Sequence, residues 1–149
     1  MMKCLLLLAI AAPLALVAQT TPNNPFTGTW KLNVAKSKFS PGPAPKSSTV
    51  AIEADGKTTV ESVTAVGETH SWSFIATEGA SAPIAGLPNS SLVDKRINVR
   101  TIQQEWNMDG TTLHGRGVVS KNGKTMTYTM TGMTPAGKPL HNVEIYEKQ

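Results

Sequence analysis

Histidines, acids and serines are the residues of this chain that could carry catalysis or hold a metal. His70, His114 and His141 lie far apart, and none has the short spacing of a zinc-ligand pair. No Gly-x-Ser-x-Gly motif activates a serine, and the ten acidic residues are scattered. We therefore predict no catalytic residues, no metal site and no cofactor, and we expect that the protein is not an enzyme.

Large and adaptable apolar side chains recur at a spacing of two in three separate stretches, and methionine among them is typical of promiscuous apolar pockets. They have two interpretations, a packed core or the lining of a pocket for a small hydrophobic or amphipathic ligand. Arg116 lies between Gly115 and Gly117, and it could either meet a ligand carboxylate or point to solvent. The candidate ligand-binding residues are Trp72, Phe74, Trp106, Met108, Arg116, Met126, Tyr128 and Met130.

Alternating apolar and polar residues indicate strands along the chain after residue 25. Asp55-Gly56 between two such runs predicts a tight hairpin, and turn signals recur about every 8 to 12 residues. No stretch holds helical spacing over three turns. We predict an all-β domain, an antiparallel up-and-down small β-barrel of about 8–9 strands, because a long chain of hairpins closes to protect its edges. A β-sandwich is the alternative.

The first strand is predicted to plug this barrel. Phe26, Gly28, Trp30 and Leu32 share one face, and Trp30 is large enough to fill the end of a small barrel. Two Pro- and Gly-rich loops follow later, over residues 35–46 and 78–91. We expect Phe39 to anchor the first, and Ile84 and Leu87 to be buried pegs of the second.

The N-terminus predicts export. Lys3 precedes an apolar run from Leu5 to Ala18, so residues 1–19 are interpreted as a cleaved signal peptide and 20–149 as one barrel domain. The run is shorter than the roughly 20 residues of a spanning helix, so no stable membrane insertion is expected after leader removal. The single cysteine, Cys4, leaves with the leader. We expect a periplasmic or extracellular protein without disulfides.

The formal net charge of +4 is mild, and its basic residues are scattered without interleaved aromatic residues. This pattern argues against nucleic-acid binding.

Gly28-x-Trp30 on the first strand resembles the pattern of lipocalins and the wider calycin group. The run from Phe26 to Pro45 and the segment Lys121-Asn122-Gly123-Lys124-Thr125-Met126-Thr127 resemble small secreted lipocalin-like proteins of environmental bacteria, mostly of unassigned function. The resemblance implies that Gly28 and Trp30 are structural, and that a late basic residue, Arg116 or Lys148, lies across the tryptophan. The chain departs from lipocalins in having no clear helix after its strands.

These observations predict an exported, non-enzymatic, lipocalin-like binding protein whose partner is a small hydrophobic ligand. One alternative is a structural or envelope-interaction protein with a filled barrel. A hydrolase or isomerase acting at the barrel mouth is the less favoured alternative. The sequence leaves the oligomeric state open.

Overall fold

The computed structural model describes residues 23–149, so the predicted signal peptide, residues 1–19, lies outside the described residues. These residues form ten strands and one short 3-10 helix, η1 (Val34–Lys36). The strands are β1 (Gly28–Leu32), β2 (Ser47–Ile52), β3 (Lys57–Val63), β4 (Thr69–Ile75), β5 (Ser81–Pro83), β6 (Ser90–Asn98), β7 (Thr101–Met108), β8 (Thr111–Val119), β9 (Thr125–Met133) and β10 (Pro139–Lys148). No helix among residues 23–149 has both the length and the apolar character needed to cross a membrane.

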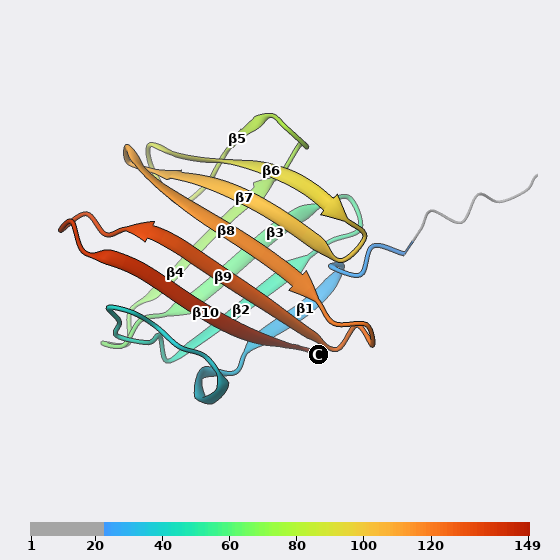
Figure 1. Cartoon of the computed structure of the whole chain (residues 1–149), viewed down its shortest axis with the longest axis horizontal. Helices are drawn as coiled ribbons and strands as arrows, with labels where there is room; N and C mark the ends of the chain where they lie inside the picture. The colour runs from blue at the N-terminus through green and yellow to red at the C-terminus, as the bar shows by residue number, and fades with distance from the viewer. Residues whose placement is uncertain (1–22) are drawn as a thin grey trace, which may run out of the picture.

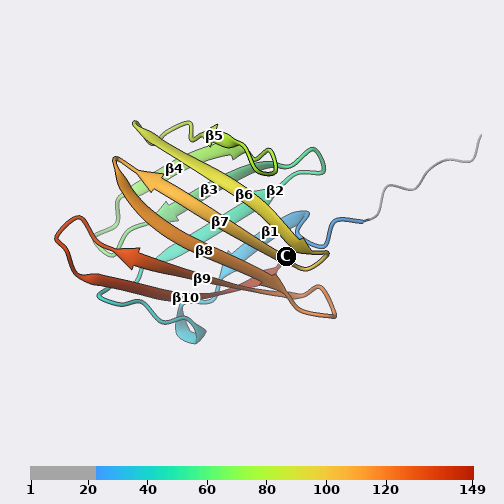
Figure 2. The same ribbon diagram turned by 45° about the horizontal axis from the view of Figure 1, so that its top comes forward.

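The strands form one antiparallel sheet that curls into a nearly closed barrel. Their order is β4-β3-β2-β1-β10-β9-β8-β7-β6-β5, so β1 pairs with β10 and strands that are consecutive in sequence pair with each other, except β4 and β5, which are the two edges of the sheet. Figures 1 and 2 show β6 to β10 as one wall and β1 to β4 as the facing wall. The two edges meet where Ser73 and Ala85 exchange two backbone hydrogen bonds of 2.9 and 2.8 Å.

The predicted all-β up-and-down barrel is confirmed, and the sandwich alternative is wrong because a single sheet wraps around the interior. The strand count is ten rather than eight or nine. One strand that the sequence did not reveal is β5, which has three residues and lies in the predicted loop over residues 78–91. Its register against β6, from Ser81 opposite Val93 to Pro83 opposite Ser91, depends on pairing that a Gly- and Pro-rich segment does not signal.

The predicted hairpin at Asp55-Gly56 joins β2 to β3. Gly56 has φ +89°, and the Lys57 backbone amide donates to Asp55 Oδ1 at 2.9 Å. Both features are typical of Asp-Gly turns, because glycine tolerates positive φ and aspartate bonds to the backbone two residues on.

The proline-rich loop after β1 takes the place of a strand beside the first half of β10. Lys38 and Val143 exchange two backbone hydrogen bonds of 2.8 Å, and the His141 amide donates to the Ser40 carbonyl at 2.9 Å. Phe39 is half-buried against the core, as expected for an anchor. The loop is thereby held against the barrel wall.

Trp30 closes one end of the barrel. Its side chain is fully buried, and its indole Nε1 donates to the Phe26 carbonyl at 2.7 Å. The Lys148 ammonium lies 5.0 Å from the centre of the indole, so Lys148 rather than Arg116 is the late basic residue beside the tryptophan. Arg96 lies over the neighbouring Phe26 ring at 5.1 Å. Two cation–π contacts therefore cover two neighbouring aromatic side chains at this end.

Replacing Trp30 by alanine should lower the free energy of unfolding by about 3–5 kcal/mol, because a large buried side chain is removed and a cavity remains. Denaturant unfolding followed by circular dichroism measures the change. Lys31→Ala on the exposed face of the same strand is the control and should stay within about 0.5 kcal/mol of the wild type. A loss below about 1 kcal/mol for Trp30→Ala would show that the plug does not hold the barrel together.

Candidate ligand-binding cavity

The barrel contains a partly open cavity of about 610 Å³. This volume falls within the roughly 300–1,000 Å³ of small-molecule sites. Its walls come from the inward faces of strands on both sides of the barrel, and Phe26 lies at the closed end. At the other end Phe39, Pro43 and Pro45 of the loop between β1 and β2, and Leu87 of the loop between β5 and β6, line the cavity.

Seven of the eight predicted ligand-binding residues line this cavity, namely Trp72, Phe74, Trp106, Met108, Met126, Tyr128 and Met130. They come from β4, β7 and β9, which the barrel brings together around one space. Phe74 and Trp106 meet edge to face, with ring centroids 5.5 Å apart and planes at 89°. This aromatic pair joins β4 to β7 on the inside of the barrel, near the seam where the sheet edges meet.

Arg116 does not line the cavity, which corrects the prediction that it could face a ligand there. It is exposed on the outer face of β8, in the same surface region as Lys95, Glu105 and His114. Alternation along β8 instead turns Gly115 and Gly117 inward, where both are buried.

The two glycines of β8 make room for the Tyr128 ring. A Cβ built at Gly115 would collide with the Tyr128 hydroxyl, and one at Gly117 would lie 3.4 Å from the ring and 3.1 Å from Ile102. The pair Gly115 and Gly117 is therefore a site of close approach, one of the two interpretations that glycine inside a strand suggests. The other interpretation, a bulge, is excluded because β8 pairs with β9 in continuous register from Leu113 to Val119.

Tyr128 stands at the centre of a polar chain inside the barrel. Trp106 Nε1 donates to the Tyr128 hydroxyl at 2.7 Å, and this hydroxyl donates to Gln104 Oε1 at 2.8 Å. Gln104 Nε2 then donates to Asp94 Oδ1 at 2.9 Å. Burial raises the pKa of the Tyr128 hydroxyl far above its usual range, so this group stays protonated and keeps donating.

A second carboxyl group, Glu144, faces the cavity from β10. Glu144 lies opposite Tyr128 in the strand register, and its Oε2 accepts from the Tyr146 hydroxyl at 2.7 Å. Burial raises the pKa of Glu144, and hydrogen bonds from Tyr146 and Asn142 partly oppose this rise. Burial likewise raises the pKa of Asp94, against the hydrogen bond from Gln104 and the charge of Arg96.

Asp94, Gln104 and Glu144 line the cavity but are not among the site residues predicted from the sequence. A signal was available, because strand alternation puts Gln104 on the face of Trp106, and Glu144 on the face of Tyr146. Polar residues at expected inward positions are the informative exceptions in a core, and they mark functional candidates.

The indole of Trp72 also lines the cavity. Its Nε1 is a buried side-chain polar atom without a hydrogen-bond partner among residues 23–149. Such an unsatisfied donor costs about 1–3 kcal/mol of stability. The cavity wall therefore carries one polar group that folding alone does not satisfy.

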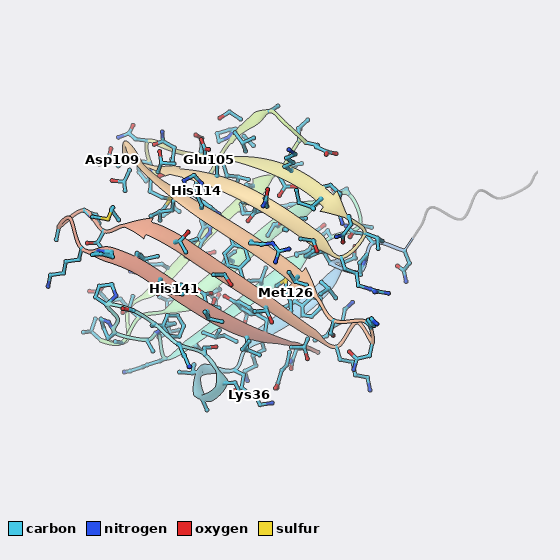
Figure 3. All side chains as sticks on the ribbon, in the orientation of Figure 1. Lys36, Glu105, Asp109, His114, Met126 and His141 are labelled. Carbon is cyan, nitrogen blue, oxygen red and sulfur yellow. The ribbon has the colours of Figure 1, made fainter. Side chains whose placement is uncertain are left out.

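The three histidines remain apart. His70 is exposed on β4, and Figure 3 shows His114 on β8 and His141 on β10, with Glu105 on the adjacent β7. Within residues 23–149, no three His, Cys, Asp or Glu side chains are grouped closely enough to hold a metal ion.

Fold and cavity together define an antiparallel up-and-down, nearly closed β-barrel with an interior pocket. The fold is similar to that of the fluorescent protein UnaG in its crystal structure, with a TM-score of 0.56 and 19% sequence identity over 83% of this chain and 97% of UnaG. Two single-residue mutants of UnaG give TM-scores of 0.53 and 0.52 at 18% and 17% identity, each covering 84% of this chain and 96% of the mutant chain. No protein-family model and no curated protein matches the sequence.

Replacing Gly115 by alanine should push the Tyr128 ring away and break the chain from Trp106 to Asp94. We expect a loss of about 1–3 kcal/mol in the free energy of unfolding, as in other overpacked cores, together with a shift in Trp106 fluorescence. Thermal and denaturant unfolding, with emission spectra, measure both effects. Arg116→Ala, the adjacent outward position, should change neither; equal effects at the two positions would contradict the inward placement of Gly115.

Replacing Glu144 by glutamine should stabilise the protein increasingly as the pH rises above 4.5, the ordinary pKa of a glutamate. Because the folded-state pKa of Glu144 is raised, the wild type is most stable while this group is protonated, and it loses stability as the pH climbs through the raised pKa. A folded-state pKa that lies one pH unit above the unfolded-state pKa corresponds to about 1.4 kcal/mol.

Denaturant unfolding at a series of pH values between about 4 and 8 measures the difference between Glu144→Gln and wild type. Glu105→Gln, at an exposed outer position, is the control and should differ from wild type by no more than about 0.5 kcal/mol. A Glu144→Gln variant that loses stability as the pH rises would reverse the expected sign.

Proposed function

We propose that the protein is an exported, non-enzymatic binding protein for a small hydrophobic or amphipathic ligand, which binds inside the barrel. The observation that carries the proposal is the cavity of about 610 Å³ lined by aromatic and methionine side chains. Well-formed apolar pockets with a few convergent polar groups are the usual form of small-molecule sites. The proposed binding residues are Trp72, Phe74, Trp106, Met108, Met126, Tyr128 and Met130.

Export is supported by the basic residue and apolar run at the start of the sequence. The absence of a nucleophile motif from the sequence supports a role in binding rather than turnover. The alternative of a structural protein with a filled barrel is less well supported, because it requires a solid interior and the barrel contains a cavity of about 610 Å³.

The proposal is tested by titration with N-phenyl-1-naphthylamine, an uncharged apolar fluorophore. We expect saturable binding of one molecule per chain, with energy transfer from the tryptophans. Trp72 and Trp106 line the cavity, whereas Trp30 is buried at the closed end. A Trp72→Phe/Trp106→Phe double variant should therefore show a smaller total loss of tryptophan emission on binding, because only Trp30 remains, while the probe's own emission still reports binding.

Arg116→Ala, on the outer face, is the matched control and should bind the probe as the wild type does. Absence of saturation, or undiminished quenching in the double variant, would count against a site inside the barrel. Recovery of N-phenyl-1-naphthylamine chemically unchanged after prolonged incubation would support the non-enzymatic role, and a converted product would overturn it.

A further inference from the structure

We propose that the cavity selects amphipathic ligands whose polar head donates hydrogen bonds, an ammonium or N–H group, and discriminates against ligands that carry a carboxylate. This inference rests on the proposed function and names the chemical class of its ligand. The reason is that several hydrogen-bond donors of the cavity wall are already bonded within the protein, whereas its carboxyl groups can accept further hydrogen bonds.

The principal donors of the interior are used within the protein. The Trp106 N–H bonds to Tyr128, the Tyr128 hydroxyl to Gln104, and the Tyr146 hydroxyl to Glu144. The Trp72 N–H has no partner among residues 23–149, but this atom is buried in the wall. A ligand that offers only acceptors would therefore not find these three donors free.

The acceptors, in contrast, are only partly used. Asp94 accepts a hydrogen bond from Gln104 through Oδ1, and Glu144 accepts one from the Tyr146 hydroxyl through Oε2 and one from Asn142. A carboxyl group has about four lone-pair positions, so both groups can accept more. Both residues line the cavity. Asp94 lies on β6 and Glu144 on β10, and Tyr128 lies between them in the strand order, on β9.

The charged and titratable groups around the cavity also favour a cationic head group over an anionic one. Asp94 and Glu144 are acidic, and the cavity-lining basic groups are Arg96 and His70. The Arg96 guanidinium donates to the Val99 carbonyl at 3.2 Å, contacts Asn24 Oδ1 at 3.5 Å and covers the Phe26 ring, so it serves the closed end. His70 is exposed, and its Nε2 lies 3.6 Å from Glu68 Oε2.

A carboxylate head brought beside either Asp94 or Glu144 would meet an acidic group in a poorly solvated site. Like charges there disfavour ionisation, and a buried charge without a partner is costly. An ammonium head would instead pair with a carboxylate, and charge-assisted hydrogen bonds of this kind are about twice as strong as neutral ones. Binding would also satisfy the acid groups whose burial is unfavourable in the free protein.

The experiment compares three amphiphiles of equal chain length, dodecylamine, dodecanol and dodecanoate, by calorimetric titration near neutral pH and below their aggregation thresholds. We expect dodecylamine to bind about tenfold or more tightly than dodecanoate, with dodecanol between them. Glu144→Gln and Asp94→Asn, tested singly, should reduce the ratio of dodecylamine affinity to dodecanol affinity, because each removes a carboxylate that pairs with the ammonium. Glu105→Gln on the outer face is the matched charge control and should leave all three affinities unchanged.

Dodecanoate binding as tightly as dodecylamine, or an amine preference that persists in both carboxyl variants, would overturn the inference while leaving the proposed function in place. Dodecanoate binding that is lost in Arg96→Gln would also overturn it, because it would place the head group at the closed end. Failure of all three amphiphiles and of N-phenyl-1-naphthylamine to bind would instead overturn the proposed function itself.

Discussion

The packing of Trp30 against Phe26 at one end of the barrel is the contact on which the interior depends. The indole is buried, its N–H bonds to the Phe26 carbonyl, and Lys148 covers the ring from the last strand. Because β1 pairs with β10, the same residue also lies where the first and last strands of the chain join. Once this end is sealed by a compact cluster, the rest of the interior need not be filled with side chains, and a cavity can exist beside a core.

The polar chain across the cavity shows how backbone clearance and hydrogen bonding are coupled. Because Gly115 and Gly117 have no side chains, the Tyr128 ring fits against β8 and its hydroxyl donates to Gln104. Gln104 in turn donates a hydrogen bond to Asp94. Burying Asp94 and Glu144 with raised pKa values costs stability. Interior groups that cost stability without packing benefit are typical of binding sites, since a solid apolar core would fold as well or better.

Strand alternation in the sequence groups Trp72 with Phe74, and Met126 with Tyr128 and Met130, and all five line the cavity. It could not decide the face of Arg116, because alternation defines two faces of a strand without saying which is inside. The clearance that Tyr128 requires over Gly115 decides this, and Tyr128 belongs to a different strand. The short strand β5 was missed for a related reason, since its pairing with β6 holds it in a segment with weak strand propensity.

The sequence alone determines the local features, which are the alternating strands, the Asp55-Gly56 turn, and a first strand whose Trp30 is suited to fill a barrel end. These depend on residue type and on neighbours a few positions away. The meeting of the sheet edges at Ser73 and Ala85, the cavity, and the shared lining by Asp94, Tyr128 and Glu144 emerge only when the whole sheet is assembled. Those residues are far apart in the chain, and the register of five consecutive strands brings them to one place, which no local pattern encodes.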